Sequence, residues 1–163
     1  MIRLYHGSNV EVVKPDLHKS KPYKDFGQGF YLSDDKQQAW DLAYNKVEQL
    51  KSGKATVSTY MFDDSMMFSN ELNIKIYKDY SEEWAEFILR NRDQTLPQPS
   101  HNYDIVYGPI ADDGVTFQLR RYRGGVISME KLIEELKYAK GITFQYFFGT
   151  EKALTRLQYD TTE

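Results

Sequence analysis

Apolar and polar residues alternate along several short segments, and this period of two predicts β-strands. The strongest alternation covers residues 142–148 and assigns the even-numbered residues to the core and the odd-numbered ones, Gln145 among them, to the other face. Glycine, proline and short polar clusters separate these segments. The predicted strands cover residues 2–6, 29–32, 55–62, 72–77, 104–107, 116–122 and 142–148.

Apolar residues recur every three or four positions in three other segments, and this spacing predicts helices over residues 34–51, 81–92 and 128–140. Ser33 or Asp34 is expected to cap the first helix and Ser81 the second. Trp40 and Trp84 fall on the apolar stripes and are assigned to the core. Residues 150–157 are expected to form a short helix or turn, and the tail is expected to fray from about residue 159.

The strands are short and alternate irregularly with helices of unequal length, so we predict an α+β fold rather than a doubly wound sheet. The chain has 163 residues, of which 40% are hydrophobic, and this suits one domain over residues 1–163 with a substantial core. No internal repeat, low-complexity tract or linker divides it.

Composition excludes several classes of function. The chain has no cysteine, so disulfides, thiol catalysis and cysteine-ligated metals are excluded. The net charge of −3 gives no reason to expect general nucleic-acid binding. No apolar run is long enough for a signal peptide or a membrane span, so we expect no membrane association and a cytoplasmic protein.

Common catalytic motifs are also missing. The three histidines lie far apart and in no metal-binding spacing, so no metal site is predicted. A P-loop, a dinucleotide fingerprint and a serine-hydrolase elbow are absent. The run from His18 to Lys24 is locally basic and is either a solvated loop or, as the alternative, a phosphate contact.

Candidate chemistry gathers in three segments: Tyr5–Ser8, Asp25–Ser33 and Thr143–Tyr146. Glycine allows a backbone to pass close to a ligand, and an aromatic residue beside it offers a flat face. If the three segments lie side by side, they form a cleft. Taken singly, each also fits a structural role, because His6 could be a core histidine and Tyr31 a packed strand residue.

Five blocks together resemble the histidine–tyrosine–glutamate class of ADP-ribosyltransferases, and in particular an uncharacterised, mostly bacterial family of small domains within that superfamily. The blocks are His-Gly-Ser, Asp-Phe-Gly-x-Gly-Phe-Tyr, Gln-Ala, Gly-Pro-x-Ala-Asp-Asp and Gln-x-x-Phe-x-Thr-Glu-x-Ala-Leu, at residues 6–8, 25–31, 38–39, 108–113 and 145–154. Their order and spacing cover essentially the whole chain. The resemblance implies a split β-sandwich of two small sheets with flanking helices and a central NAD cleft.

The resemblance also implies roles for individual residues, with NAD as substrate and an unknown acceptor that is a protein, a nucleic acid or a small molecule. His6 would bind the adenosine ribose, Tyr31 would stack on the nicotinamide, and Gln145 would hold the ribose 2′-hydroxyl. By the same resemblance, the residues expected to bind the dinucleotide are His6, Gly7, Ser8, Gly27, Gly29, Phe30, Tyr31 and Ser33.

Gln145 departs from the class, which has a glutamate at this position. A neutral amide can orient a ribose but stabilises a developing positive charge much less. Glu151 could substitute only if the following turn brings it back. The alternative is therefore an inactive module that binds a nucleotide or a protein, and a toxin with an unknown target is a third reading.

Four charged residues are expected to have structural roles. Arg90 and Arg92 end a predicted helix and suit its dipole, with contact to the NAD pyrophosphate as the alternative. Asp104 and Asp112 are expected to be hydrogen-bonded near the cleft and to hold its loops.

Overall fold

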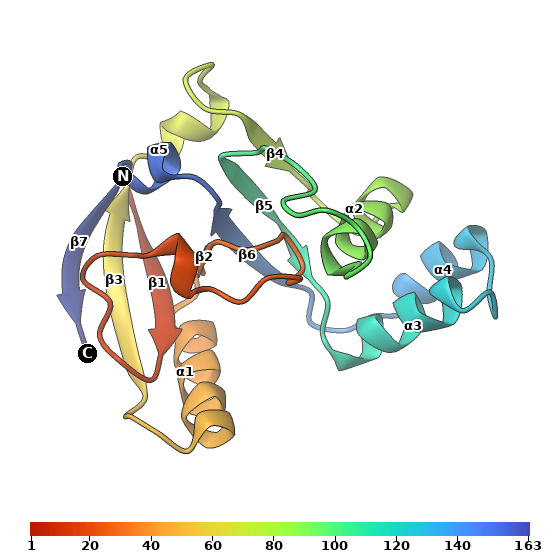
Figure 1. Cartoon of the computed structure of the whole chain (residues 1–163), viewed down its shortest axis with the longest axis horizontal. Coiled ribbons are helices and arrows are strands. Elements are labelled where there is room, and N and C mark those ends of the chain that lie inside the picture. The colour runs from red at the N-terminus through yellow and green to blue at the C-terminus, as the bar shows by residue number, and fades with distance from the viewer.

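The computed structural model describes all 163 residues and has an α+β architecture of two small sheets with flanking helices (Figure 1). The first sheet has the order β1-β3-β7, formed by β1 (Ile2–Ser8), β3 (Thr56–Phe62) and β7 (Leu157–Thr162). The second has the order β2-β6-β5-β4, formed by β2 (Phe30–Leu32), β6 (Thr143–Phe148), β5 (Ile105–Ile110) and β4 (Ile74–Ile76). All neighbouring strands are antiparallel except β4 and β5. The predicted α+β class is confirmed at this level.

The helices are α1 (Lys36–Leu50), α2 (Glu82–Arg92), α3 (Asp113–Arg123), α4 (Met129–Leu136) and α5 (Glu151–Leu154), with two short 3₁₀ turns at Leu17–Lys19 and Asp64–Phe68. Each α-helix begins at a side chain that accepts a hydrogen bond from a backbone N–H of the first turn; these residues are Asp35, Ser81, Asp112, Ser128 and Thr150. The cap of α1 is therefore Asp35, not Ser33 or Asp34. No helix is both long and apolar enough to cross a membrane.

The central strand β6 is buried on both faces, and this joins two apolar clusters. Phe148 packs with Phe62 in the cluster between the two sheets. Phe147 points the other way, into a cluster that contains Phe87 of α2. The prediction of one core face on this strand was therefore wrong, because Phe147 is 2% exposed while Ile142, outside the strand, is 39% exposed.

The two tryptophans differ in their surroundings. Trp84 is fully buried, as predicted, and its indole N–H donates to the Pro109 carbonyl at 2.8 Å, which ties α2 to β5. Trp40 is half-buried against Tyr44 and belongs to neither apolar cluster, so the assignment of Trp40 to the core was wrong. Only Ala39 and Ala43 of α1 are buried, because this helix packs on the sheet through small residues.

Two segments differ from their predicted structure. Residues 116–122 belong to helix α3 rather than a strand, since Val115, Leu119 and Tyr122 repeat at helical spacing after the Asp112 cap. The tail expected to fray is strand β7, which pairs with β3 from Phe62–Leu157 to Ser58–Thr162. This pairing gives hydrogen-bond partners to the edge of β3 that faces away from β1.

Gly7 allows α1 to lie directly on β1. A Cβ at this position would lie 1.9 Å from the Ala39 carbonyl oxygen of α1, well inside van der Waals contact. The His-Gly-Ser block therefore has a packing requirement before any role in binding is considered.

Gly7→Ala is expected to lower the free energy of unfolding by about 2–4 kcal/mol, because α1 must move off the sheet to admit the methyl group. The measurement is urea denaturation followed by tryptophan fluorescence. Gly114→Ala is the control, since a Cβ there meets only the Asp112 carboxylate at 3.5 Å within a helix, and its stability should be unchanged or slightly raised. Equal stability of Gly7→Ala and the wild type would contradict this account.

Candidate functional site

Strands β1 and β2 join the two sheets at a single point and then diverge. The Tyr5 N–H donates to the Ser33 carbonyl at 2.8 Å and the Ser33 N–H to the Tyr5 carbonyl at 2.9 Å. Continued in this register, the ladder would pair Gly7 with Tyr31, but no such pair forms. We call the place where the two strands stop pairing the β1–β2 split.

His6 occupies the split in its neutral form. Its Nδ1 lies 2.7 Å from the Tyr31 carbonyl, which can only accept, so Nδ1 carries the proton. Its Nε2 is then a hydrogen-bond acceptor, and the chain supplies it with no partner. The ring stacks on Phe30 at 4.2 Å between centroids. Burial, with smaller effects from the nearby positive charges, lowers the pKa of His6 to about 4, so the imidazole stays uncharged at pH 7.

The backbone of Gly7 faces the same split. On β3, the residue opposite is Val57, whose N–H and C=O both bond to Glu163 of β7 and so point away from β1. Antiparallel ladders alternate, and the Gly7 N–H and C=O therefore point toward β2. Neither group forms a backbone hydrogen bond with β2. The Gly7 N–H donor and C=O acceptor are thus unpaired on the edge of β1, next to the residue that carries the unpaired Nε2 of His6.

Tyr31 is fixed by its hydroxyl. The phenol O–H donates to the Gly27 carbonyl at 2.6 Å and accepts the Phe26 N–H at 3.0 Å. Phe147 contacts the ring by its edge at 5.2 Å, and the Lys24 ammonium lies 5.3 Å from the ring centroid. Burial raises the pKa of Tyr31 well above its ordinary value, so the hydroxyl stays protonated. The ring is consequently held in one orientation.

Asp25 fastens the glycine loop, residues 25–29, to the second sheet and its helices. Its Oδ1 accepts from the Arg92 guanidinium at the end of α2, with Nε–Oδ1 at 2.8 Å. Its Oδ2 accepts the Ala111 N–H at 2.8 Å, and the Asn91 amide donates to its backbone carbonyl at 2.9 Å. Arg92, which the sequence suggested was a helix-dipole partner or, as the alternative, a pyrophosphate contact, is therefore an ion-pair residue of this loop.

His101 supports the loop from behind. Its Nδ1 accepts the Tyr103 N–H at 3.1 Å, so its Nε2 carries the proton and donates to the Phe26 carbonyl at 2.7 Å. Burial lowers the pKa of this histidine as well. Its contacts are with the chain itself, which makes its role structural.

The glycines of the loop are explained by packing. Gly27 has φ +99°, which disfavours any other residue, and a Cβ on Gly29 would lie 2.3 Å from the Phe147 ring. Gln28 between them is exposed and donates to the Ser20 carbonyl at 2.7 Å. These positions shape the loop, and their packing alone gives no evidence of ligand contact.

Gln145 lies on the same face of the second sheet as Tyr31. Tyr31 is opposite Phe147 on β6, and Gln145 is two residues from Phe147, so their side chains share a face. Gln145 is 5% exposed, and its amide is not among the fully enclosed side-chain groups that lack a hydrogen-bond partner. Glu151 is exposed in α5, beyond the other end of β6, so it does not take the place of Gln145.

The remaining predicted binding residues are buried. Phe30 lies between the sheets, and Ser8 has only a weak contact to the neighbouring Asn9 amide at 3.4 Å. Ser33 donates to the Gln38 Oε1 at 2.5 Å, while the Gln38 Nε2 is buried without a partner. The structure therefore brings His6 to the Tyr31 carbonyl and the Phe30 ring, with the Gly7 peptide edge facing the same strand, and places the Tyr31 ring and Gln145 together on the other face of the second sheet.

The two aspartates expected near the cleft are hydrogen-bonded, but only one of them is buried. Asp104 accepts from Asn73 N–H at 2.8 Å and from the Thr150 hydroxyl at 2.5 Å. Asp112 is exposed and caps α3 by accepting the Val115 N–H at 2.8 Å.

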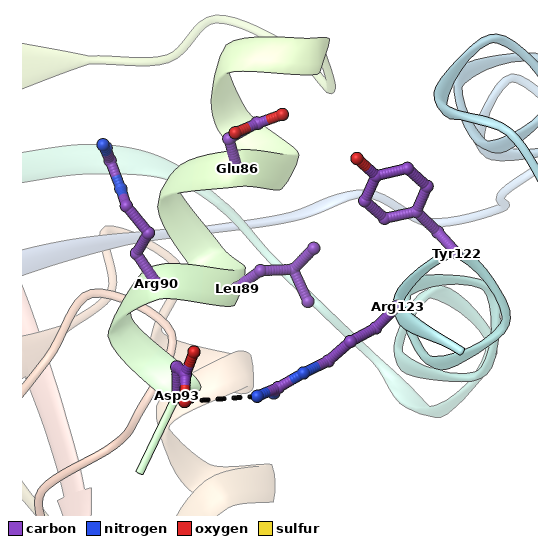
Figure 2. Close-up of a pocket in the computed structure, with 6 residues that line it drawn as sticks. All are labelled: Glu86, Leu89, Arg90, Asp93, Tyr122 and Arg123. Atoms are coloured by element: carbon purple, nitrogen blue, oxygen red, sulfur yellow. Dashed lines mark ion pairs between the residues drawn. The ribbon is translucent and has the colours of Figure 1, made fainter. Parts of the chain in front are cut away.

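Two surface cavities lie away from the split. One of about 140 Å³ lies between α2 and the end of α3, where Arg123 pairs with Asp93 at 3.3 Å (Figure 2). It is too small for a dinucleotide. The other, of about 440 Å³, lies between α1 and residues 53–55 before β3, and its lining includes Trp40, Tyr44 and Glu163. Neither contains His6, Tyr31 or Gln145.

A family model described as protein of unknown function (DUF3990) matches residues 2–159, nearly the whole chain. No curated protein and no solved structure matches.

Asp25→Asn is expected to lower the free energy of unfolding by about 1–3 kcal/mol, because the partly buried Arg92 loses its anionic partner. Amide hydrogen exchange at Phe26 and Gly29 should accelerate. Denaturation and exchange measurements check this, with Glu48→Gln as the matched control at an exposed ion pair with Lys51. If both variants lose equally little stability, Asp25 does not fasten the loop.

The His6 imidazole is expected to titrate near pH 4 in the folded protein, which NMR of its ring protons measures. Because the folded pKa lies below the unfolded value of about 6.5, the unfolded state binds more protons between these values. Stability is therefore full above about pH 6.5 and falls as the pH drops toward 4.

His101 adds to this fall, since its pKa is also lowered. His6→Gln should therefore make the fall of stability with acid shallower without removing it. A His6 that titrates near pH 6.5 would contradict the neutral assignment.

Proposed function

The chain belongs to the family described as protein of unknown function (DUF3990), and we propose that it binds NAD at the β1–β2 split and cleaves its nicotinamide–ribose bond. ADP-ribose would pass to an acceptor or to water. The observation that carries this proposal is the unused peptide edge of Gly7 beside the unpaired Nε2 of a neutral His6.

A carboxamide is complementary to such an edge. The Gly7 C=O can accept from the amide NH₂ of nicotinamide while the Gly7 N–H donates to its oxygen, as in one step of a β-ladder. The Tyr31 ring lies on the next strand and offers a rigid aromatic face. A flat ring that carries a carboxamide, such as nicotinamide, suits both features.

The neutral His6 supplies the next contact. An acceptor nitrogen without a partner can receive a ribose O–H, whereas a protonated imidazole could only donate. Its low pKa keeps this acceptor available at neutral pH. The stack on Phe30 fixes the direction in which Nε2 points.

The chemical step would break the bond between the nicotinamide nitrogen and the ribose C1′, with the electron pair leaving on nicotinamide. A nucleophile or water then attacks C1′, and its proton passes to solvent. The intermediate resembles an oxocarbenium ion and gains from nearby negative charge. Gln145 can orient the ribose 2′-hydroxyl but supplies only a dipole, which favours slow single transfer or hydrolysis over chain elongation.

A second candidate is a module that binds the dinucleotide without cleaving it. The neutral Gln145 favours this reading, because no carboxylate takes its place and Glu151 lies at the other end of β6. Turnover separates the two candidates, since only the enzyme releases nicotinamide.

Wild-type protein is expected to release nicotinamide from NAD, and Tyr31→Ala should weaken NAD binding by about 1–3 kcal/mol through loss of the aromatic face. Chromatographic detection of nicotinamide and calorimetric titration measure the two quantities. Tyr44→Ala, at an exposed tyrosine of α1, is the matched control and should leave both unchanged. Tyr31→Phe keeps the ring if Tyr31→Ala fails to fold.

Gln145→Glu sharpens the test, because a carboxylate at this position should accelerate nicotinamide release by about tenfold or more. Binding of NAD without release by either protein would favour the module. Absence of both binding and release in folded protein would overturn the proposal.

A further inference from the structure

Two lysines approach the split from its two sides. Lys24 precedes the glycine loop and lies with its ammonium 5.3 Å from the Tyr31 ring centroid. Lys46 follows the buried Ala39 and Ala43 by seven and three positions, so it lies on the side of α1 that packs on β1, where the Ala39 carbonyl faces Gly7. Burial lowers the pKa of His6 most, and the charges of Lys46 and Lys24 lower it further, so both act on the same imidazole. No pattern in the sequence pointed to Lys46.

The chain leaves these charges without a counter-ion. Neither lysine forms an ion pair, and the carboxylate next to Lys24 belongs to Asp25, which is occupied by Arg92 and Ala111. Lys46 has no acidic residue three or four positions away on α1; its neighbours there are Leu42, Ala43, Gln49 and Leu50. The pKa of Lys24 is lowered first by desolvation of its ammonium beside the Tyr31 ring and then by the charges of Lys46 and Lys21, while the Asp25 charge raises it.

Two like charges held close together repel each other and oppose folding. Because Lys24 and Lys46 form no ion pair within the chain, their combined charge would attract an anionic ligand. We propose that Lys24 and Lys46 hold the diphosphate of a dinucleotide at the mouth of the split. This inference rests on the proposed function and names the group by which the site holds its ligand. Lysine ammonium groups bind phosphate as compact point charges, and two of them match the two negative charges of a diphosphate.

Lys24 has a second consequence for binding. Its ammonium occupies the face of Tyr31 where a cationic pyridinium ring would stack, and both are attracted by the same ring electrons. The nicotinamide of NAD therefore replaces Lys24 on the ring, and the released ammonium is free to contact the diphosphate. The loop lysine thus exchanges one partner for another when ligand enters.

The test uses ADP-ribose and inorganic pyrophosphate as probes, because neither contains nicotinamide and neither is cleaved. Lys24→Met and Lys46→Met keep the apolar stem and remove the charge. Each is expected to weaken ADP-ribose binding about tenfold in calorimetry at about 50 mM salt, where screening is modest. The double variant should lose pyrophosphate binding and the salt dependence of ADP-ribose affinity. Adenosine, which lacks phosphate, should bind all variants equally.

Lys14→Met and Lys140→Met are matched controls, since both residues are exposed, lie away from the split and change the net charge equally. They should bind ADP-ribose as the wild type does. Circular dichroism and thermal unfolding check that all five variants are folded.

The outcomes separate this inference from the proposed function. Unchanged ADP-ribose affinity in Lys24→Met and Lys46→Met would overturn the diphosphate site, even if the wild type releases nicotinamide. If the Lys24 and Lys46 variants lose binding of ADP-ribose and pyrophosphate while the Lys14 and Lys140 controls keep it, the diphosphate site is supported, even if no protein releases nicotinamide. A wild type that binds neither probe, or controls that weaken binding equally, would also overturn it.

Discussion

The ion pair between Asp25 and Arg92 is the interaction on which the candidate site depends. One carboxylate binds the end of α2 through Arg92 and the start of the β5–α3 connection through Ala111, so it joins the glycine loop to two elements distant in sequence. Tyr31 is positioned by that loop, because its hydroxyl bonds to Gly27 and Phe26. A side chain outside the split therefore determines the shape of one side of it. Because Asp25 pairs with Arg92, its carboxylate forms no ion pair with the adjacent Lys24, so the same pairing affects the charge of the site as well as its geometry.

The β1–β2 split begins where the Tyr31 carbonyl bonds to the His6 ring instead of to the backbone of β1. Up to Tyr5 and Ser33 the backbones of β1 and β2 satisfy each other. At Tyr31 the carbonyl accepts from the His6 ring instead, and the Gly7 peptide is left unused. A side chain has thus replaced a backbone donor, which lets the two sheets diverge without leaving the Tyr31 carbonyl unpaired. Packing requires glycine at position 7 in any case, because of Ala39. Structural and binding explanations of the His-Gly-Ser block are therefore compatible, and its presence alone does not choose between them.

Local patterns predicted most elements, and their failures have physical causes. Strand and helix periods located β1, β3, α1 and α2 because apolar residues recur regularly along their sequences, although β3 is buried on both faces and α1 buries only Ala39 and Ala43. The pattern misled at β6, which is covered on both faces, and at residues 157–162, whose strand structure depends on the distant edge of β3. At the site, the glycines and aromatic residues of the sequence predicted that His6 and Tyr31 lie in a binding cleft. The pairing of Asp25 with Arg92 and the approach of Lys46 arise between segments far apart in sequence, and no local spacing encodes them.

The charges around the split bear differently on binding and on chemistry. Positive charge from Lys24 and Lys46 favours an anionic ligand, but it would oppose the positive ribose that the proposed cleavage of NAD forms. Gln145 offers no negative charge to offset this, and Asp25 is occupied by Arg92. The remaining source of negative charge is the ligand's own diphosphate, which the lysines would neutralise in holding it. A site built this way would bind its ligand better than it stabilises the transition state. If the protein is an enzyme, its rate would then come mainly from positioning the ribose rather than from electrostatic stabilisation.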